Sequence, residues 1–118
     1  RSEFRGRKDV LVTHPFDRDT PCVLRRRVHL PAGRRATLRL VVSHHCQPDG
    51  DWDLVVRADG RELLREIISR ETVTNQWRVV TVDLSPLAGS EVTLELLNQA
   101  NGWAWEAAYW GEVTLLIE

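Results

Sequence analysis

The residues best suited to contacting a ligand lie close together in the last quarter of the chain. Residues 98–106 read Asn-Gln-Ala-Asn-Gly-Trp-Ala-Trp-Glu, so that two indoles accompany three amides and a carboxylate. Indole rings pack on the apolar faces of sugar rings, while amides and carboxylates form hydrogen bonds with hydroxyl groups. The segment therefore predicts a carbohydrate site made by six residues: Asn98, Gln99, Asn101, Trp103, Trp105 and Glu106.

The two tryptophans of this segment also have an interpretation as core residues. Trp103 and Trp105 share their parity with Tyr109, Val113 and Leu115, so one continuous strand would turn all five side chains to the same face. Large apolar side chains on one face of a strand are usually buried. Exposure of the two indoles in a structure would decide between the two interpretations.

A second candidate surface is rich in arginine. Residues 1–59 carry twelve Arg and Lys against eight Asp and Glu, a net charge of +4, whereas residues 60–118 carry four against nine, a net charge of −5. If residues 31–35 form a hairpin turn, one outward face gathers Arg25, Arg27, His29, Arg35, Thr37 and Arg39. The four arginines of this face could bind a sulfated glycan or an acidic protein. Alternatively, Glu91 and Glu95 of a later strand neutralise them.

The same hairpin would bring the two cysteines of the chain together. Cys22 would lie opposite His44 or Cys46, at a Cβ separation of about 4.5–5.5 Å, which is near disulfide reach. We therefore expect a disulfide between Cys22 and Cys46, with two buried thiols as the alternative. A disulfide would indicate an exported protein, extracellular or periplasmic.

Neither metal pattern in the sequence is complete. His44, His45 and Cys46 are adjacent, but the chain has no C-x-x-C or H-x-x-x-H spacing, so we expect no zinc site. Oxygen ligands for a structural calcium could come from Asp17, Asp19, Asp49, Asp51 and Asp53. Turn chemistry alone explains the Asp-Gly-Asp sequence at residues 49–51. The sequence therefore predicts no cofactor, with structural calcium kept as an alternative.

Motifs of known catalytic machinery are missing from the sequence. It contains no G-x-S-x-G, no P-loop and no H-E-x-x-H. We therefore expect a protein without enzymatic activity. The net charge of −1 makes nucleic acid an unlikely partner, and no apolar run approaches the roughly 20 residues of a membrane-spanning helix.

The elements that must position these residues alternate between apolar and polar side chains, as strands do. Asp59 and Gly60 form the strongest hairpin-turn signal. The pattern predicts about eight strands, near residues 10–13, 22–30, 36–42, 52–58, 61–68, 77–84, 92–96 and 105–118. Strands at this spacing are typical of an antiparallel β-sandwich or barrel.

The length of 118 residues suits one domain. We expect residues 10–118 to form it, with residues 1–9 as an N-terminal segment outside the fold. The chain has no methionine and begins Arg-Ser-Glu-Phe, which indicates a piece of a longer protein.

Residues 50–118 resemble the galactose-binding-like jelly rolls. Residues 52–60, Trp-Asp-Leu-Val-Val-Arg-Ala-Asp-Gly, look like a strand and hairpin of that fold, and residues 77–89 are similar to its W-x-x-V-x-V-D-L-S-x-x-A-G segment. Residues 92–96 and the A-x-W-x-x-V-x-L pattern at residues 108–115 resemble its later strands. Gly111 departs from the family, which often has an acidic residue there.

This resemblance implies an all-β jelly-roll sandwich that works as a carbohydrate-binding accessory domain of a larger extracellular protein. The partner would be a neutral or sulfated glycan. The alternative is a protein-interaction or spacer module without a sugar ligand, whose arginine surface would bind an acidic partner.

Overall fold

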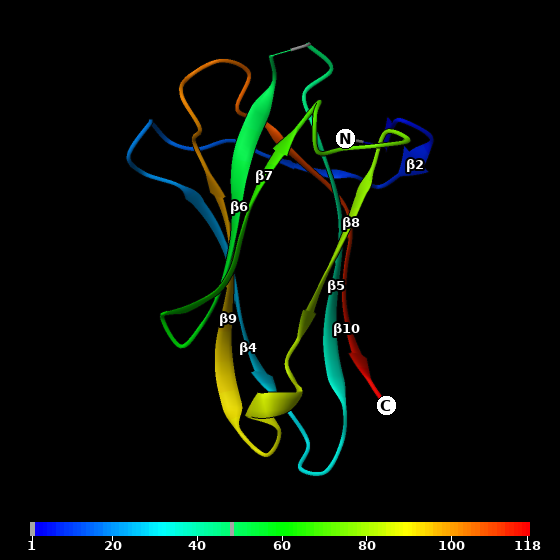
Figure 1. The fold of residues 1–118 in the computed structure, drawn as a ribbon, viewed down its shortest axis with the longest axis vertical. Coiled ribbons are helices and arrows are strands. Elements are labelled where there is room, and N and C mark those ends of the chain that lie inside the picture. Colours follow the sequence, from blue (N-terminus) through cyan, green and yellow to red (C-terminus); the bar gives the residue numbers. More distant parts are fainter. Residues whose placement is uncertain (1, 48) are drawn as a thin grey trace.

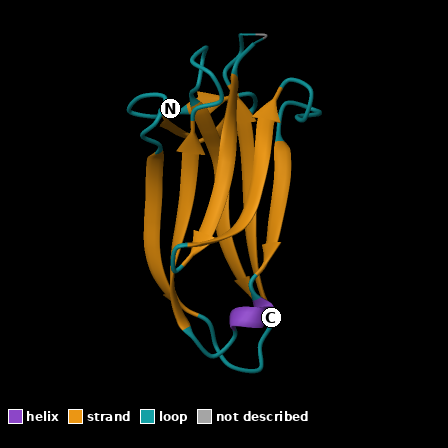
Figure 2. Ribbon diagram, turned by 60° about the vertical axis from the view of Figure 1, so that its left-hand side comes forward, coloured by secondary structure: helices purple, strands orange, loops and turns teal. Residues whose placement is uncertain are grey.

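Two antiparallel sheets face each other in the computed structural model, which describes residues 2–47 and 49–118. Figures 1 and 2 show the two layers, with the connecting loops gathered at the two ends of the long axis. In order across the first sheet, the strands are β3 (Leu11–Thr13), β10 (Ala108–Ile117), β5 (Ala36–His44) and β8 (Arg78–Asp83). Across the second they are β4 (Cys22–His29), β9 (Glu91–Gln99), β6 (Asp51–Ala58) and β7 (Arg61–Ser69). The predicted all-β sandwich of antiparallel strands is confirmed.

The core lies between the sheets because alternate side chains of each strand point inward. Trp52 is fully buried there, and its ring lies 5.1 Å from that of Trp110, centroid to centroid. Further buried members come from both layers: Leu38, Leu40, Val42, Leu54, Val56, Ile68, Val80, Val82, Val92, Leu94 and Leu96. The period-two pattern of the sequence thus identified the inward face of most strands.

The predicted hairpin around residues 31–35 is wrong. β4 pairs with β9, with Arg25 opposite Glu95, whereas β5 lies between β10 and β8 in the other sheet. Residues 30–35 cross from one sheet to the other, and six residues can span about 20 Å, twice the usual distance of about 10 Å between packed sheets. Side-chain parity indicates which way a residue points but does not reveal which strand lies beside it. For this reason, the sequence pattern alone led to the wrong pairing.

The predicted disulfide is also wrong, for the same reason. Cys22 lies opposite Asn98 of β9, and Cys46 lies exposed in the loop after β5; both thiols are free. The argument for an exported protein that rested on this disulfide has therefore lost its basis.

The turn at Asp59 and Gly60 is confirmed. Ala58 and Arg61 are partners at the end of the β6–β7 pair, and the two turn residues have φ of +49° and +80°. Positive φ at both central residues is the geometry of a two-residue hairpin whose twist matches its strands. Asp59 is held further by Thr93 of β9, whose backbone N–H donates to its carboxylate at 2.8 Å.

Replacing Gly60 by valine is expected to lower the free energy of unfolding by about 1–2 kcal/mol, because φ of +80° is unfavourable for a β-branched residue. Urea denaturation measures the loss. Arg61→Val is the matched control, since it places the same side chain one residue later, at an exposed strand position that tolerates it. Equal stability of Gly60→Val and wild type would contradict this turn geometry.

Residues 1–9 were expected to form a segment apart from the sandwich. In the structure, β1 (Glu3–Phe4) and β2 (Arg7–Lys8) form a short hairpin, and Phe4 stacks on Tyr109 of β10 with ring centroids 3.9 Å apart. Trp77 donates its indole N–H to the backbone oxygen of Arg5 at 3.0 Å. The described part of this segment therefore packs on the end of the sandwich. Nothing in the sequence pattern predicted this packing, since it depends on contacts between residues about 70–105 positions apart.

Candidate functional site

The segment predicted to bind a sugar forms a loop at one end of the sandwich. Residues 100–107 connect β9 to β10 there, next to the loop that follows β5 at residues 45–47 (upper part of Figure 1). Trp103 is 43% exposed and Trp105 is 50% exposed. The interpretation of these two residues as core is therefore wrong. It assumed a continuous strand from residue 105, but β10 starts at Ala108 and strand parity does not extend into the loop.

Each exposed indole contacts a histidine from another loop. The Trp105 ring stacks on His45, with centroids 4.7 Å apart and an angle of 22° between the planes. Trp103 meets His14 edge to face at 5.4 Å. These histidines were not predicted as part of the site, and no spacing in the sequence connects residues 14 and 45 to this loop. Their contacts fix part of each indole while leaving roughly half of its surface exposed.

A buried carboxyl group holds the loop from below. Glu106 is 1% exposed, and its two carboxyl oxygens accept hydrogen bonds from the backbone N–H groups of Asn101 at 3.0 Å and Ala104 at 3.3 Å. Trp105 has φ of +56°, a left-handed conformation that a tryptophan rarely adopts without outside support. The bonds to Glu106 thus constrain the backbone that carries both indoles.

Burial raises the pKa of Glu106 from its ordinary value of 4.5 to about 7, and the neighbouring Asp51 carboxyl also contributes. The pKa of Asp51 is raised as well, mainly by its own burial. Neighbouring carboxyl groups oppose each other's ionisation, and this adds to the effect of burial on the pKa of Glu106. The loop therefore rests on a group whose charge changes in the physiological range.

The three amides of the predicted site differ in their burial. Asn98 is fully buried; its Nδ2 donates to the backbone oxygen of Thr13 at 3.2 Å and to that of Glu106 at 3.3 Å. Asn101 is half-buried and donates from Nδ2 to Asp53 at 2.9 Å. Gln99, at the end of β9, is also half-buried. Asn98 has the inward parity of Leu94 and Leu96, a signal of its burial that was present in the sequence.

The six predicted site residues thus fall into three groups. The side chains of Trp103 and Trp105 are exposed, those of Gln99 and Asn101 are partly accessible, and those of Asn98 and Glu106 are buried beneath the loop. Direct contact of all six with a ligand remains a prediction. Because Asn98 and Glu106 are buried, we expect them to support the loop rather than to contact the ligand.

The aspartates considered for calcium lie in different surroundings. Asp17 accepts from the backbone N–H groups of Asp19 and Thr20 at 2.8 Å, as a turn aspartate does. Asp49 and Asp51 line a small cavity of about 230 Å³ together with Ser69 and Glu71, next to Gly50. Within the described residues, no three His, Cys, Asp or Glu side chains are grouped so that they could hold a metal ion.

The arginines of the predicted basic face lie on both sheets. On the second sheet, Arg25 bonds Glu95 at 2.6 Å and Arg27 bonds Glu91 at 2.9 Å, the two acidic partners that the alternative interpretation proposed. On the first sheet, Arg39 bonds Glu112 at 2.9 Å, and Arg35 lies in the loop before β5. The four arginines therefore do not form one hairpin face, and three of them are already paired.

Comparison with known proteins was informative only at the level of structure, since no protein-family model and no curated protein matches this sequence. The sugar-binding C-terminal domain of EclA superposes with a TM-score of 0.69 and 14% identity, covering 91% of this chain and 76% of that one. A cyclase from Fischerella sp., solved without ligand, superposes with a TM-score of 0.63 and 14% identity, covering 99% and 68%.

At this identity the likeness shows the fold. The chain is a β-sandwich domain similar in fold to the EclA domain, and this likeness is consistent with the expected carbohydrate-binding-like β-sandwich. In the described part of the chain, no helix reaches the length and apolarity that crossing a membrane demands.

Proposed function

We propose that this chain is a non-catalytic carbohydrate-binding domain of a larger protein, and that the sugar docks on the loop at residues 100–107. The observation that carries the proposal is the pair of exposed indoles, Trp103 and Trp105, on a backbone held by the buried Glu106. A preformed aromatic platform loses little conformational entropy on binding. Asn101 and Gln99, both partly accessible, would supply hydrogen bonds to hydroxyl groups.

The fold shared with a sugar-binding domain supports this proposal, and the fold shared with a cyclase raises the question of catalysis. A pKa of about 7 would suit Glu106 for proton transfer. Its side chain is only 1% exposed, however, and both carboxyl oxygens accept bonds from loop N–H groups. We therefore assign Glu106 to holding the loop, and we propose no enzymatic activity.

The alternative, a spacer or protein-interaction module, would draw on the arginine surface. Because Arg25, Arg27 and Arg39 already have carboxylate partners, an acidic partner would have to displace those pairs. An extracellular or periplasmic location stays a prediction from the family resemblance, since Cys22 and Cys46 form no disulfide that would support it.

A glycan array with neutral and sulfated sugars, probed at low and at physiological salt, tests the proposed function. We expect binding to a neutral glycan that salt does not weaken. Trp103→Ala and Trp105→Ala should each reduce the affinity at least about tenfold, because an aromatic platform supplies most of the apolar contact with a sugar ring. Arg27→Gln is the matched control on the other surface and should bind as wild type.

Thermal unfolding of both tryptophan variants separates loss of binding from loss of folding. The free energy of unfolding of each variant should stay within about 0.5 kcal/mol of the wild-type value, as is usual for surface substitutions. Salt-sensitive binding to sulfated glycans alone, lost in Arg27→Gln and kept in Trp105→Ala, would move the site to the arginines. No binding to any glycan on the array would favour the spacer interpretation.

A further inference from the structure

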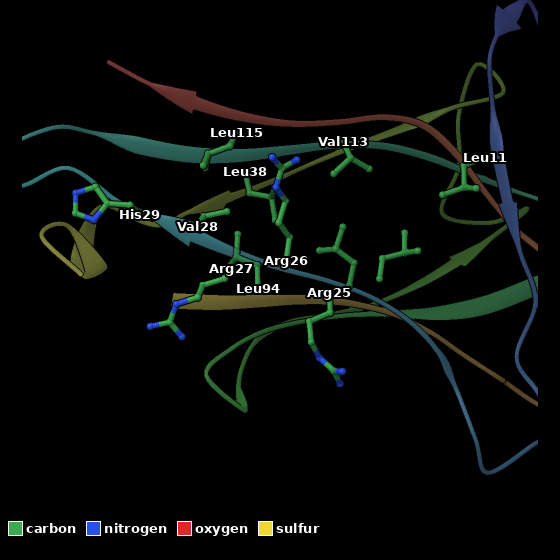
Figure 3. A pocket seen from close by; sticks show the side chains of 12 residues that line it. Leu11, Arg25, Arg26, Arg27, Val28, His29, Leu38, Leu94, Val113 and Leu115 are labelled. Atoms are coloured by element: carbon green, nitrogen blue, oxygen red, sulfur yellow. The ribbon is translucent and has the colours of Figure 1, made fainter. Parts of the chain in front are cut away.

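One flank of the sandwich is open along β4 and β10, and none of the residues that line it belongs to the sugar loop. β4 is the outermost strand of its sheet, and β3 covers β10 only at residues 108–110. Between the two strands lies a cavity of about 660 Å³, shown in Figure 3, which we call the β4–β10 groove. Its volume falls within the range of about 300–1,000 Å³ that is typical of small-molecule sites.

The β4–β10 groove is lined mainly by apolar side chains from both sheets. Leu38, Leu94 and Leu96 belong to the core and are 3–6% exposed, while Leu11 and Val113 are each 48% exposed. None of the lining residues is an aspartate or a glutamate. A ligand that fits this groove must therefore present an apolar body.

Three arginines line the groove, and Arg26 is the one whose side chain is directed into its apolar space. It has the same strand parity as Leu24 and Val28, which pack against the core, and Figure 3 shows its side chain rising into the groove. The adjacent Arg25 and Arg27 point away and are paired with glutamates. Within the described residues, Arg26 has no carboxylate partner. A guanidinium beside apolar surface is the arrangement that recognises a carboxylate at the end of an apolar chain.

An added peptide strand is another occupant that an open sheet edge permits. A charged side chain that points inward from an edge strand opposes such pairing, because a neighbouring strand would bury it. Arg26 occupies this position in the middle of β4. Arg26 therefore opposes the addition of a strand to β4 and favours the binding of a small, negatively charged ligand.

We propose that the β4–β10 groove binds a monomeric long-chain carboxylate of the fatty-acid type. The carboxylate accepts hydrogen bonds from the Arg26 guanidinium, and the chain lies along the leucines of β4 and β9 and along Val113 of β10. This site is independent of the proposed sugar site, because no residue lines both.

Titration of the whole chain with 11-(dansylamino)undecanoic acid, below the concentration at which it forms micelles, tests the proposal. We expect saturable binding with increased dansyl emission. Dodecanoate should displace the probe at least about tenfold better than dodecan-1-ol, which lacks the charge. Arg26→Gln should weaken binding about tenfold, whereas Arg61→Gln, at an exposed arginine of β7 that does not line the groove, should leave it unchanged.

Val113→Trp provides a second, independent variant. Val113 is half exposed, so the larger side chain can be accommodated without disturbing the core, and it should fill the groove and abolish probe binding. Absence of saturable binding to wild type overturns the proposal, as does equal affinity in Arg26→Gln. Displacement of the probe by a peptide of alternating glutamate and valine, but not by dodecanoate, would show a strand-binding edge instead and also overturn it.

Discussion

Trp52→Ala is expected to lose about 3–5 kcal/mol of unfolding free energy, the usual cost of removing a large aromatic side chain from a core. Trp52 is fully buried, packs against Trp110 and donates its indole N–H to the backbone oxygen of Ser43 at 3.1 Å. The alanine would leave a cavity and would remove one hydrogen bond to a buried backbone oxygen. Because a domain of this kind is stable by only about 5–15 kcal/mol, this loss is a large fraction of its total stability.

Chemical denaturation monitored by circular dichroism measures this loss. Trp52→Phe retains an aromatic ring and should cost clearly less than the alanine, although it too removes the hydrogen bond to Ser43. Trp103→Ala is the control for an exposed indole and should change stability little. If Trp52→Ala and Trp103→Ala were equally stable, the assignment of Trp52 to the core and Trp103 to the surface would be wrong.

The second large expected effect is that the free energy of unfolding depends on pH through the ionisation of Glu106. Its pKa is about 7 in the folded chain against 4.5 ordinarily, so the folded state binds more protons than the unfolded state between these values. Its contribution to the free energy of unfolding is therefore fully present below about pH 4.5 and is lost as the pH rises to about 7. Since one pKa unit corresponds to about 1.4 kcal/mol, the loss is at most about 3 kcal/mol.

Comparison with Glu106→Gln measures this effect together with the change it causes at the neighbouring Asp51 carboxyl. Glutamine has nearly the same shape and cannot ionise, so the variant should gain stability relative to wild type as the pH is raised from 5 to 8. The pKa of His44 is lowered, mainly by burial. The contribution of His44 to the free energy of unfolding therefore increases as the pH rises, which is opposite to the effect of Glu106. His44 is present in both proteins, so the difference between their melting temperatures removes its contribution. A difference that is independent of pH would contradict the shifted pKa.

Much of the fold was predictable because strands have a side-chain period of two. Alternation identified the inward faces of β5, β6 and β9, and the turn at Asp59 and Gly60 follows from residues that accept positive φ. These are local properties, determined within a few residues. The tryptophan and amide composition of residues 98–106 likewise indicated where to look for a site.

The partner of each strand and the exposure of each site residue were decided by the tertiary structure. Cys22 faces Asn98 rather than Cys46 because β4 and β5 enter different sheets. Glu106 is buried because the loop folds over it and directs two backbone N–H groups to its carboxyl oxygens. The strands, the main hairpin turn and the residues of a candidate sugar surface could therefore be predicted from local patterns. The sheet order, the exposure of Trp103 and Trp105 and the groove beside Arg26 could not, because they depend on contacts between residues far apart in the chain.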